Sequence, residues 1–447
     1  MARLPEKRSG RGASRCRTAD LSGDSIHNVS ESLRGGVDAV RRFSPAARQF
    51  LIFSLLLGIA FGIFNLVFNL YMSALGFSNA IIGVFNSLPA LALLGIGLPF
   101  AAMADRTGYR VFLLVAGGLA AIGSLGLALA GQPLTAVLAA GTFALAVTIL
   151  QVLSGPLLAE VSSTSERTML FSVNQSIGWV AVLAGDLLGG LIPEAAGRAS
   201  HASVSSAASI RTAFIAMTAL VLLGLPFLGR LSRVAGARPA KALPIRDMLR
   251  VDTRRFARLL IPEVFLGIGA GMYLTFVQLY FSQRFHLTPG PIGVILAVGA
   301  ALTAVGSLGA PAVGRRLGMS RAVGLSQLVG FPLIAALAFL TTLPLVVIIF
   351  YVRQIALNIQ SPLATVFGME YVPPEQRARL STALTLGWGI GGGGIGPLAS
   401  GFLQALGGFQ LAFSIASVFY LLAGLSFLML FGRVRLPSED RPSVSAL

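Results

Sequence analysis

Long apolar segments follow one another along most of the chain, and they limit its possible folds more than any other feature. The chain has 447 residues, of which 55% are hydrophobic and only 11% are charged. A soluble domain averages about 25% charged residues, so too few charges remain here to cover a water-facing surface. The apolar segments reach about 20 residues or more, which is the length of a membrane span rather than of a core helix.

Twelve such segments can be counted, and each can cross a hydrocarbon core about 30 Å thick at about 1.5 Å per residue. Most of the connections are short, so neighbouring helices are expected to run antiparallel. The expected fold class is all-α integral membrane, with twelve transmembrane helices. The spans are 49–75, 79–103, 110–130, 134–158, 168–193, 211–230, 256–283, 289–313, 321–341, 343–369, 379–406 and 410–432.

A stretch of sequence occurs twice, once in each half of the chain. Asn69-Leu-Tyr71-Met-Ser73 returns as Gln278-Leu-Tyr280-Phe-Ser282, and Ile82-Gly83-Val84 returns as Ile292-Gly293-Val294. The offset of 209 or 210 residues also relates Trp179 to Trp388, which we expect to be packing anchors. The duplication predicts two pseudo-symmetric six-helix bundles. The expected parts are a polar, disordered tail at 1–48, bundles at 49–230 and 256–432, a linker at 231–255 and a tail at 433–447.

The basic residues indicate the direction of the spans. Of the 34 Lys and Arg residues, 30 lie in the two tails, the linker and the loops after the second, fourth, eighth and tenth spans. Arg198, Arg211 and Arg284 lie on the other side, where a flexible loop is expected at 194–210. Because basic residues concentrate on the cytoplasmic side, we expect both termini in the cytoplasm. The expected location is the inner (plasma) membrane of the cell.

Several classes of function are excluded by the pattern. The net charge of +17 does not indicate nucleic-acid binding, because the basic residues are split among short segments between apolar runs. The single cysteine, Cys16, cannot form an intrachain disulfide. The glycine run 391–394 follows no strand and precedes no Lys-Ser/Thr pair, so it is not a phosphate loop. We expect no enzyme activity, no cofactor and no metal site.

The loop between the second and third spans contains Ala104-Asp105-Arg106-Thr107-Gly108-Tyr109-Arg110. This segment resembles the G-x-x-x-D-R-x-G-R-R motif of the major facilitator superfamily, in which Asp105, Arg106, Gly108 and Arg110 match. Ala101 replaces the leading glycine, and Tyr109 replaces one arginine. The symmetric loop after the eighth span holds Arg315 and Arg316, with Arg315 where the aspartate would be.

The resemblance covers about residues 49–432 and implies the superfamily fold and transport by alternating access. It also implies that the charged loop is a gate that holds the bundles together in the outward-open state. An aspartate can pair there with arginine across helix ends and with the dipole of a neighbouring helix. A charged turn without a gating role is the alternative.

Three ionisable residues lie inside predicted spans, where such residues are costly and mark function. They are Arg353 in 343–369, Glu263 in 256–283 and Asp186 in 168–193. Glu263 and Asp186 are candidate proton carriers, because burial favours the neutral acid while a nearby arginine favours the carboxylate. Arg353 would contact an anionic or polar group of a substrate near the membrane midplane. A buried ion pair of Arg353 with either acid is the alternative.

Polar side chains gather on the four spans that line the central cavity in the superfamily, namely the first, fourth, seventh and tenth. On the tenth, Arg353, Gln354 and Asn358 fall within one sector at 100° per residue. Hydrogen bonds between helices are the alternative role for the amides on the first and seventh spans. The candidate substrate-binding residues are Arg353, Gln354, Asn358, Asn65, Asn69, Gln151, Gln278 and Tyr280.

Together these features favour a secondary active transporter that performs proton-coupled export of small organic or drug-like molecules. An uptake symporter or uniporter for a small polar or anionic metabolite is the alternative, which Arg353 would favour. A non-transporting membrane sensor or scaffold is an alternative of another class. The expected partners are a small-molecule substrate, protons and the lipid bilayer, without nucleic acid, and the expected state is a monomer.

Overall fold

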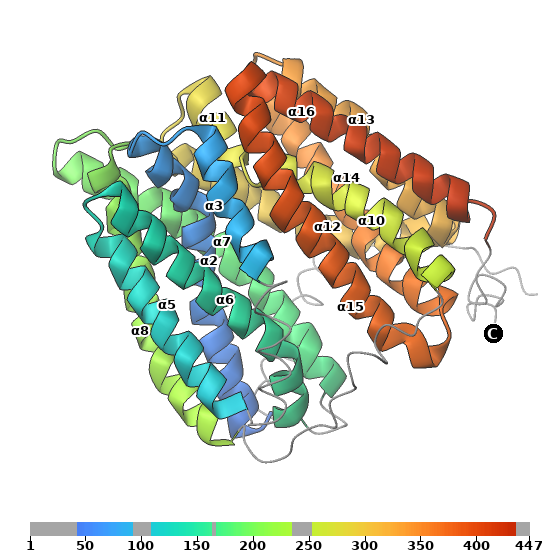
Figure 1. The fold of residues 1–447 in the computed structure, drawn as a ribbon, viewed down its shortest axis with the longest axis horizontal. Helices are drawn as coiled ribbons and strands as arrows, with labels where there is room; N and C mark the ends of the chain where they lie inside the picture. Colours follow the sequence, from blue (N-terminus) through green and yellow to red (C-terminus); the bar gives the residue numbers. More distant parts are fainter. Residues whose placement is uncertain (1–42, 93–108, 163–166, 235–252, 435–447) are drawn as a thin grey trace, which may run out of the picture. The chain divides into compact units, whose positions relative to one another are not determined.

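The computed structural model describes residues 43–92, 109–162, 167–234 and 253–434, and every regular element in these ranges is a helix. The chain divides into two compact units, Met1–Ser44 and Pro45–Leu447. All the helices of the described residues belong to the second unit (Figure 1). The expected all-α membrane fold is confirmed.

The first half of the second unit forms an N-terminal bundle. Its helices pack through α2 against α7 and α8, and through α5 against α6 and α8. Close packing of these helices is expected because they contain many Gly and Ala residues, whose small side chains let helix backbones approach each other. The helices are α2 (Pro45–Ala74), α3 (Asn79–Ala92), α5 (Tyr109–Leu129), α6 (Pro133–Val161), α7 (Arg167–Ala199) and α8 (Ala207–Val234).

The second half forms a C-terminal bundle with the same order of packing. The last helix packs against the first and against α13, while α14 packs against α12 and α13. The elements are α10 (Thr253–Leu274), α11 (Val277–Phe285), α12 (Pro289–Leu317), α13 (Met319–Phe339), α14 (Leu343–Tyr371), η2 (Pro374–Gln376), α15 (Arg377–Trp388), the π-helix η3 (Gly389–Ile395) and α16 (Gly396–Phe431).

Ten segments of the described residues are long and apolar enough to span a membrane. One of them, Arg379–Phe431, contains two predicted spans, because Gly407 and Gly408 depart from helical geometry and Gly408 has a φ of 64°. The span predicted at 79–103 is described only as far as Ala92, as α3. The ten segments thus correspond to eleven of the predicted spans, and α3 is the described part of the twelfth.

Two details differ from the sequence expectation. The span predicted at 256–283 is broken between α10 and α11, at Thr275 and Phe276. The loop expected at 194–210 is largely helical, since α7 continues to Ala199 and α8 starts at Ala207. Glu194 therefore lies on a helix, where its carboxylate accepts a hydrogen bond from Arg198 Nη2 at 2.8 Å, four residues on.

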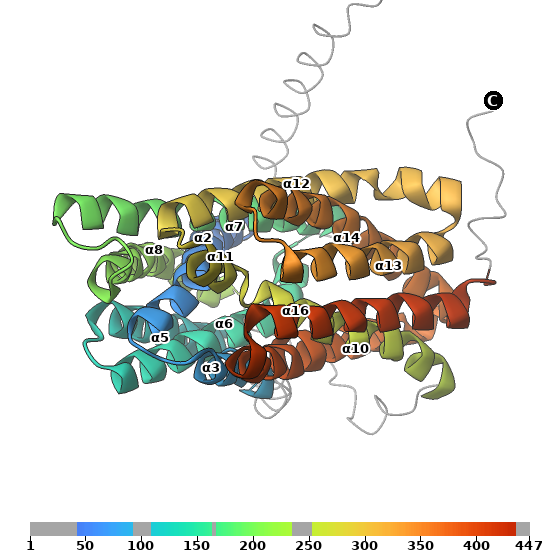
Figure 2. The same cartoon turned by 90° about the horizontal axis from the view of Figure 1, so that it is seen from above.

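The two bundles meet through two helix crossings that the sequence repeat explains. Figure 2 shows α7 beside α12, and α3 beside α16. A Cβ on Gly83 of α3 would lie 3.0 Å from Gly401 Cα of α16, and a Cβ on Gly293 of α12 would lie 3.0 Å from Gly190 Cα of α7. The repeated Ile-Gly-Val segment thus places a glycine at each crossing, and the glycine allows the backbones to approach closely.

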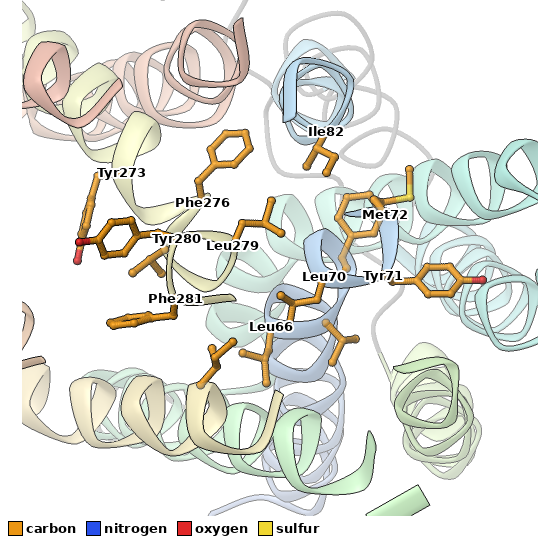
Figure 3. Close-up of a cluster of buried hydrophobic side chains, with 14 of the residues drawn as sticks. Leu66, Leu70, Tyr71, Met72, Ile82, Tyr273, Phe276, Leu279, Tyr280 and Phe281 are labelled. Atoms are coloured by element: carbon orange, nitrogen blue, oxygen red, sulfur yellow. The ribbon is translucent and has the colours of Figure 1, made fainter. Parts of the chain in front are cut away.

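Two matched tyrosines fix the ends of helices inside each bundle. The hydroxyl of Tyr71 donates to the Ala130 carbonyl at 2.9 Å, and that of Tyr280 donates to the Leu337 carbonyl at 2.7 Å. In Figure 3 the two rings point away from each other, each into its own bundle, within one continuous cluster of buried apolar side chains. These tyrosines stabilise the bundles, since buried hydroxyls need a partner.

Candidate functional site

The helices of the second unit have their ends at two opposite sides. We call one the Gly76 end, where α2 connects to α3 and α11 connects to α12. We call the other the Arg315 end, where α12 ends with the exposed Arg315 and Arg316. Asp105, Arg106 and Gly108 lie outside the described residues, as does the side chain of Arg110, so the predicted gating loop stays a prediction.

At the Gly76 end the bundles are joined by a reciprocal pair of hydrogen bonds, which we call the amide contact. Asn69 Nδ2 donates to the Thr275 carbonyl at 2.5 Å, and Gln278 Nε2 donates to the Asn65 carbonyl at 3.1 Å. Thr275 lies in the break between α10 and α11, where a carbonyl without a helical partner can accept from a side chain. Asn69 and Gln278 are 2% and 5% exposed, so both amides are withdrawn from solvent.

Further contacts between the bundles lie on the same side of the molecule. Ser87 Oγ of α3 donates to the Gly394 carbonyl at 2.9 Å. Glu194 Oε2 of α7 accepts from Thr288 Oγ1 at 2.9 Å and from the Gly290 amide at 3.3 Å, at the first turn of α12. A carboxylate at a helix N-terminus is stabilised by the free amides and the helix dipole.

A cavity of about 600 Å³ lies on the other side of the amide contact, mainly within the C-terminal bundle. Its lining comes from α10, α12, α14, α15 and α16, and among the described residues only Trp179 of α7 represents the N-terminal bundle. The lining runs from Arg353 and Tyr420 to Leu259, Met369 and Ser381, which lie close to the helix ends at the Arg315 end. The volume suits a small organic molecule.

Two facing walls of the cavity differ in chemistry. On α14, Gln354, Asn358, Ser361 and Thr365 follow at spacings of four, three and four residues, which is one face of a helix. On α10 the lining face carries Leu259, Glu263, Leu266, Ala270 and Leu274, which is apolar except for one carboxylate. A polar wall opposite an apolar wall is suited to an amphipathic guest.

Arg353 lies at the deep end of the cavity and is only 4% exposed. Its Nη2 donates to the Tyr420 hydroxyl at 2.7 Å, and its Nη1 donates to the neighbouring Gln354 Oε1. The guanidinium carbon lies 4.8 Å from the centre of the Tyr273 ring, in cation–π geometry. All of these partners are uncharged, and Nε has no hydrogen-bond partner among the described residues.

Neither of the two acids inside the spans neutralises Arg353. No ion pair joins Arg353 to Glu263 or to Asp186, although Glu263 lines the same cavity. Asp186 is 7% exposed on α7, and its backbone carbonyl faces Gly293 of α12 at the helix crossing. The structure therefore offers no support for the expected alternative of a buried Arg–carboxylate pair.

Only some of the residues predicted to bind substrate line the cavity. Arg353, Gln354 and Asn358 line the cavity, together with Glu263. Asn69 and Gln278 form the amide contact with their side chains, which is the alternative expected from the sequence. Asn65 takes part only through its backbone carbonyl, and its side chain is exposed. Tyr280 is bonded inside the C-terminal bundle, and Gln151 is exposed on α6 outside the cavity lining.

Sequence reasoning overlooked several lining residues. Tyr420 of α16 lines the cavity and is otherwise buried. Its hydroxyl lies within the apolar span 410–432, and this was the sequence signal that could have identified it. Trp179 and Trp388, expected to be packing anchors, both line the cavity and are 38% and 41% exposed. Ser381 and Thr385 of α15 also contribute, four residues apart on one helix face.

Comparison with known proteins gives a consistent result. A family model described as the Major Facilitator Superfamily matches residues 50–393 and 259–446. A bacterial homologue of the human lysosomal transporter Spinster, in an inward-facing and occupied conformation, superposes with a TM-score of 0.70 at 14% identity, over 89% of this chain and 98% of that one. A bacterial homologue of the iron transporter ferroportin, in an inward-facing state, has a TM-score of 0.70 at 15% identity, over 86% and 98% of the two chains.

The nucleoside transporter NupG superposes with a TM-score of 0.68 at 16% identity, over 87% of this chain and 99% of that one. At these identities the likeness concerns the fold. No curated protein sequence matches the chain.

Proposed function

The chain belongs to the major facilitator superfamily, and on that basis we propose that it is a secondary transporter that carries a small organic molecule by alternating access, coupled to protons. The two bundles would rock about the cavity, so that the site opens to one side of the membrane at a time. The family and the multi-pass membrane fold stand independently of this proposal.

One observation carries the proposal most directly. The cavity beside Arg353 is sealed at the Gly76 end by contacts between the bundles, and its lining extends toward the Arg315 end. The seal consists of glycine crossings and uncharged hydrogen bonds, apart from Glu194. Such contacts can be broken and re-formed, because no buried ion pair has to be separated.

The orientation follows from the distribution of basic residues. Because 30 of the 34 Lys and Arg residues are expected on the side of the Arg315 end, that end faces the cytoplasm in our proposal. The conformation described would then be inward-facing, in the cell inner membrane.

Glu263 is the residue we propose to carry the proton. It lines the cavity, lies on the otherwise apolar wall of α10 and forms no ion pair with a described residue. A carboxylic acid in apolar surroundings favours its neutral form, and opening of the cavity to water favours the carboxylate. Asp186 is the weaker candidate, because it lies at the α7–α12 crossing outside the cavity lining.

Cysteine labelling can test alternating access without knowledge of the substrate. The chain has a single cysteine, Cys16, so Cys16→Ser gives a clean background. Ser87→Cys then reports the sealed Gly76 end, and Ser381→Cys reports the open end of the cavity. In proteoliposomes, a membrane-impermeant maleimide added on the side of the Arg315 end should label Ser381→Cys fast. The same reagent added on the side of the Gly76 end should label Ser87→Cys slowly.

The decisive sample combines both cysteines. A maleimide attached at position 87 keeps the Gly76 end open as a wedge, so it should slow labelling at position 381 by tenfold or more, equivalent to about 1.4 kcal/mol. Unchanged labelling at position 381 after modification of position 87 would show that the two ends move independently, which contradicts alternating access.

The proton carrier can be tested on the same preparation. The labelling rate at position 381, corrected for maleimide chemistry with a free thiol, should depend on pH in the parent. That dependence should disappear in Glu263→Gln and persist in Asp186→Asn. Retention of the dependence in both variants would remove Glu263 and Asp186 as carriers. Export stays a prediction from the sequence, and flux measured in vesicles of both orientations decides it.

A further inference from the structure

No described residue forms an ion pair with Arg353. The side chain is 4% exposed, and its partners are a hydroxyl, an amide oxygen and an aromatic ring. A buried guanidinium surrounded by neutral groups is destabilised relative to one paired with an anion. Arginine inside a membrane protein normally faces a partner of opposite charge or a water-filled pathway.

Two hydrogen-bonding groups beside this charge also lack partners. Arg353 Nε and the Tyr273 hydroxyl are both buried and without a hydrogen bond to a described residue. Tyr273 belongs to α10, and its ring lies against the guanidinium. Buried polar atoms are seldom left unsatisfied, and those that are call for a functional explanation. Both atoms are donors suited to an anionic oxygen.

The charge pattern of the whole lining limits the anion to one negative charge. Arg353 is the one cationic side chain among the lining residues that the structure describes, and Glu263 is the one acid. When Glu263 is protonated, a dianion such as a phosphate monoester would place an unbalanced negative charge in the cavity, whereas a carboxylate balances Arg353 alone. The planar guanidinium also matches a carboxylate through paired N–H donors.

The walls indicate the rest of the ligand. Hydrocarbon side chains form a large part of the lining of the 600 Å³ cavity and offer no hydrogen-bonding groups. They are the apolar residues of α10 together with Leu357 and Phe427. Their contact with a hydrocarbon group would add about 25 cal/mol per Å² of buried apolar area. The polar face of α14 would meet water or hydroxyl groups on the opposite side.

We propose that this cavity binds small organic monocarboxylates, with the carboxylate on Arg353 and an apolar group against the α10 wall. This assignment rests on the proposed function only in taking the cavity as the substrate site. It names the class of substrate, and the residue that selects it.

The protein contains its own reporter for this site. Trp179 and Trp388 are the two tryptophans of the chain, and both line the cavity. Cyclohexanecarboxylate is a suitable probe, because it absorbs little in the tryptophan band and combines a carboxylate with a compact apolar ring. Cyclohexanecarboxamide has nearly the same shape without the charge.

Titration of the purified full chain in detergent should give a saturable change of tryptophan emission with the carboxylate and a response at least tenfold weaker with the carboxamide. Arg353→Met keeps the length of the side chain without its charge, and should weaken carboxylate binding on the order of 100-fold. Arg353→Lys should retain the preference for the carboxylate at reduced affinity, because it keeps the charge and loses the fork.

Arg284→Met is the matched control. Arg284 also has an Nε without a partner, but it lies near the Gly76 end, where its Nη2 donates to the Leu340 carbonyl at 3.4 Å. This variant should bind the carboxylate like the parent. Thermal unfolding of every variant without ligand shows whether the fold is retained, and carboxylate should raise the midpoint of the parent but not of Arg353→Met.

Three outcomes would overturn the proposal: no saturable response to the carboxylate, an equal response to the carboxamide, or unchanged affinity in a folded Arg353→Met. The binding measurement requires no transport, and the labelling test of alternating access requires no ligand. A failure of one therefore leaves the other standing.

Discussion

The two bundles are alike where they touch each other and different where the cavity lies. Gly83 and Gly293 occupy matching positions and form matching helix crossings. Asn69 and Gln278 also match, and each donates to a backbone carbonyl of the opposite bundle. Both halves therefore contribute matching residues to the contacts that close the Gly76 end.

The cavity residues show the opposite. At the offset of 209 residues, the position of Arg353 corresponds to Ala144, and that of Glu263 corresponds to Ser54. Ser54 donates to Asn174 Oδ1 at 2.9 Å within the N-terminal bundle, as an ordinary helix-to-helix hydrogen bond. The comparison indicates that the duplicated residues form the contacts between the two bundles. The residues that differ between the two halves, such as Arg353 and Glu263, provide the chemistry of the site.

The strongest test of this division moves the charge from one bundle to the other. Arg353→Ala should weaken binding of cyclohexanecarboxylate on the order of 100-fold. Adding Ala144→Arg should not restore it, because α6 lacks the tyrosines that surround Arg353. Tryptophan titration measures both. Recovery in the double variant would mean that the halves are interchangeable at the cavity.

The glycine crossings should respond equally in both halves. Gly83→Leu and Gly293→Leu each insert a side chain where backbone atoms already meet, which costs about 1–3 kcal/mol in a packed interior. Each should raise the labelling rate of Ser87→Cys by about 30-fold, by opening the Gly76 end. Gly118→Leu is the control, since no atom lies within 4 Å of a Cβ at Gly118. A response confined to one crossing would refute the symmetry of closure.

The amide contact should give a smaller and equally shared effect. Asn69→Ala and Gln278→Ala each remove one hydrogen bond between bundles, worth about 1 kcal/mol in a membrane protein. Labelling of Ser87→Cys should rise by about fivefold in each variant, with carboxylate binding unchanged in the tryptophan titration. Loss of carboxylate binding in either variant would indicate that the altered amide contacts the substrate.

The smallest expected effect is on the free energy of unfolding when single tyrosine hydroxyls are removed. These variants compare hydroxyls that form a hydrogen bond with one that does not. Tyr71→Phe and Tyr280→Phe should each lower the free energy of unfolding by about 0.6 kcal/mol, because each loses a hydrogen bond. Tyr273→Phe should not lower it, since its hydroxyl has no partner among the described residues. Denaturant titration in detergent measures all three. Equal losses for Tyr273 and Tyr280 would indicate that the Tyr273 hydroxyl is bonded.

Sequence reasoning recovered the helices because membrane spans leave a local signal. Apolar length alone identifies a span, and the repeat of Ile82-Gly83-Val84 identified the two halves. It also identified Arg353, Gln354, Asn358 and Glu263 as candidates, because polar groups inside spans are rare. It could not find the break at Thr275 and Phe276, since the Thr275 carbonyl accepts a hydrogen bond from Asn69, which is 206 residues away in the sequence.

The same limit explains why Asn69, Gln278 and Tyr280 were grouped with the cavity. Their polarity marks them as important, but whether an amide faces a cavity or a neighbouring backbone depends on how two bundles are placed against each other. Trp179 was not identified as a lining residue for the same reason, because its exposure to the cavity depends on packing between helices of both halves.

The sequence by itself determined the helical membrane fold, its duplication and the few buried polar residues that can act, because the bilayer penalises each exposed polar group residue by residue. Only the tertiary structure decided which of these residues close the Gly76 end and which surround the cavity. That division depends on contacts between residues about 200 positions apart, such as Asn69 with Thr275, which no local pattern encodes.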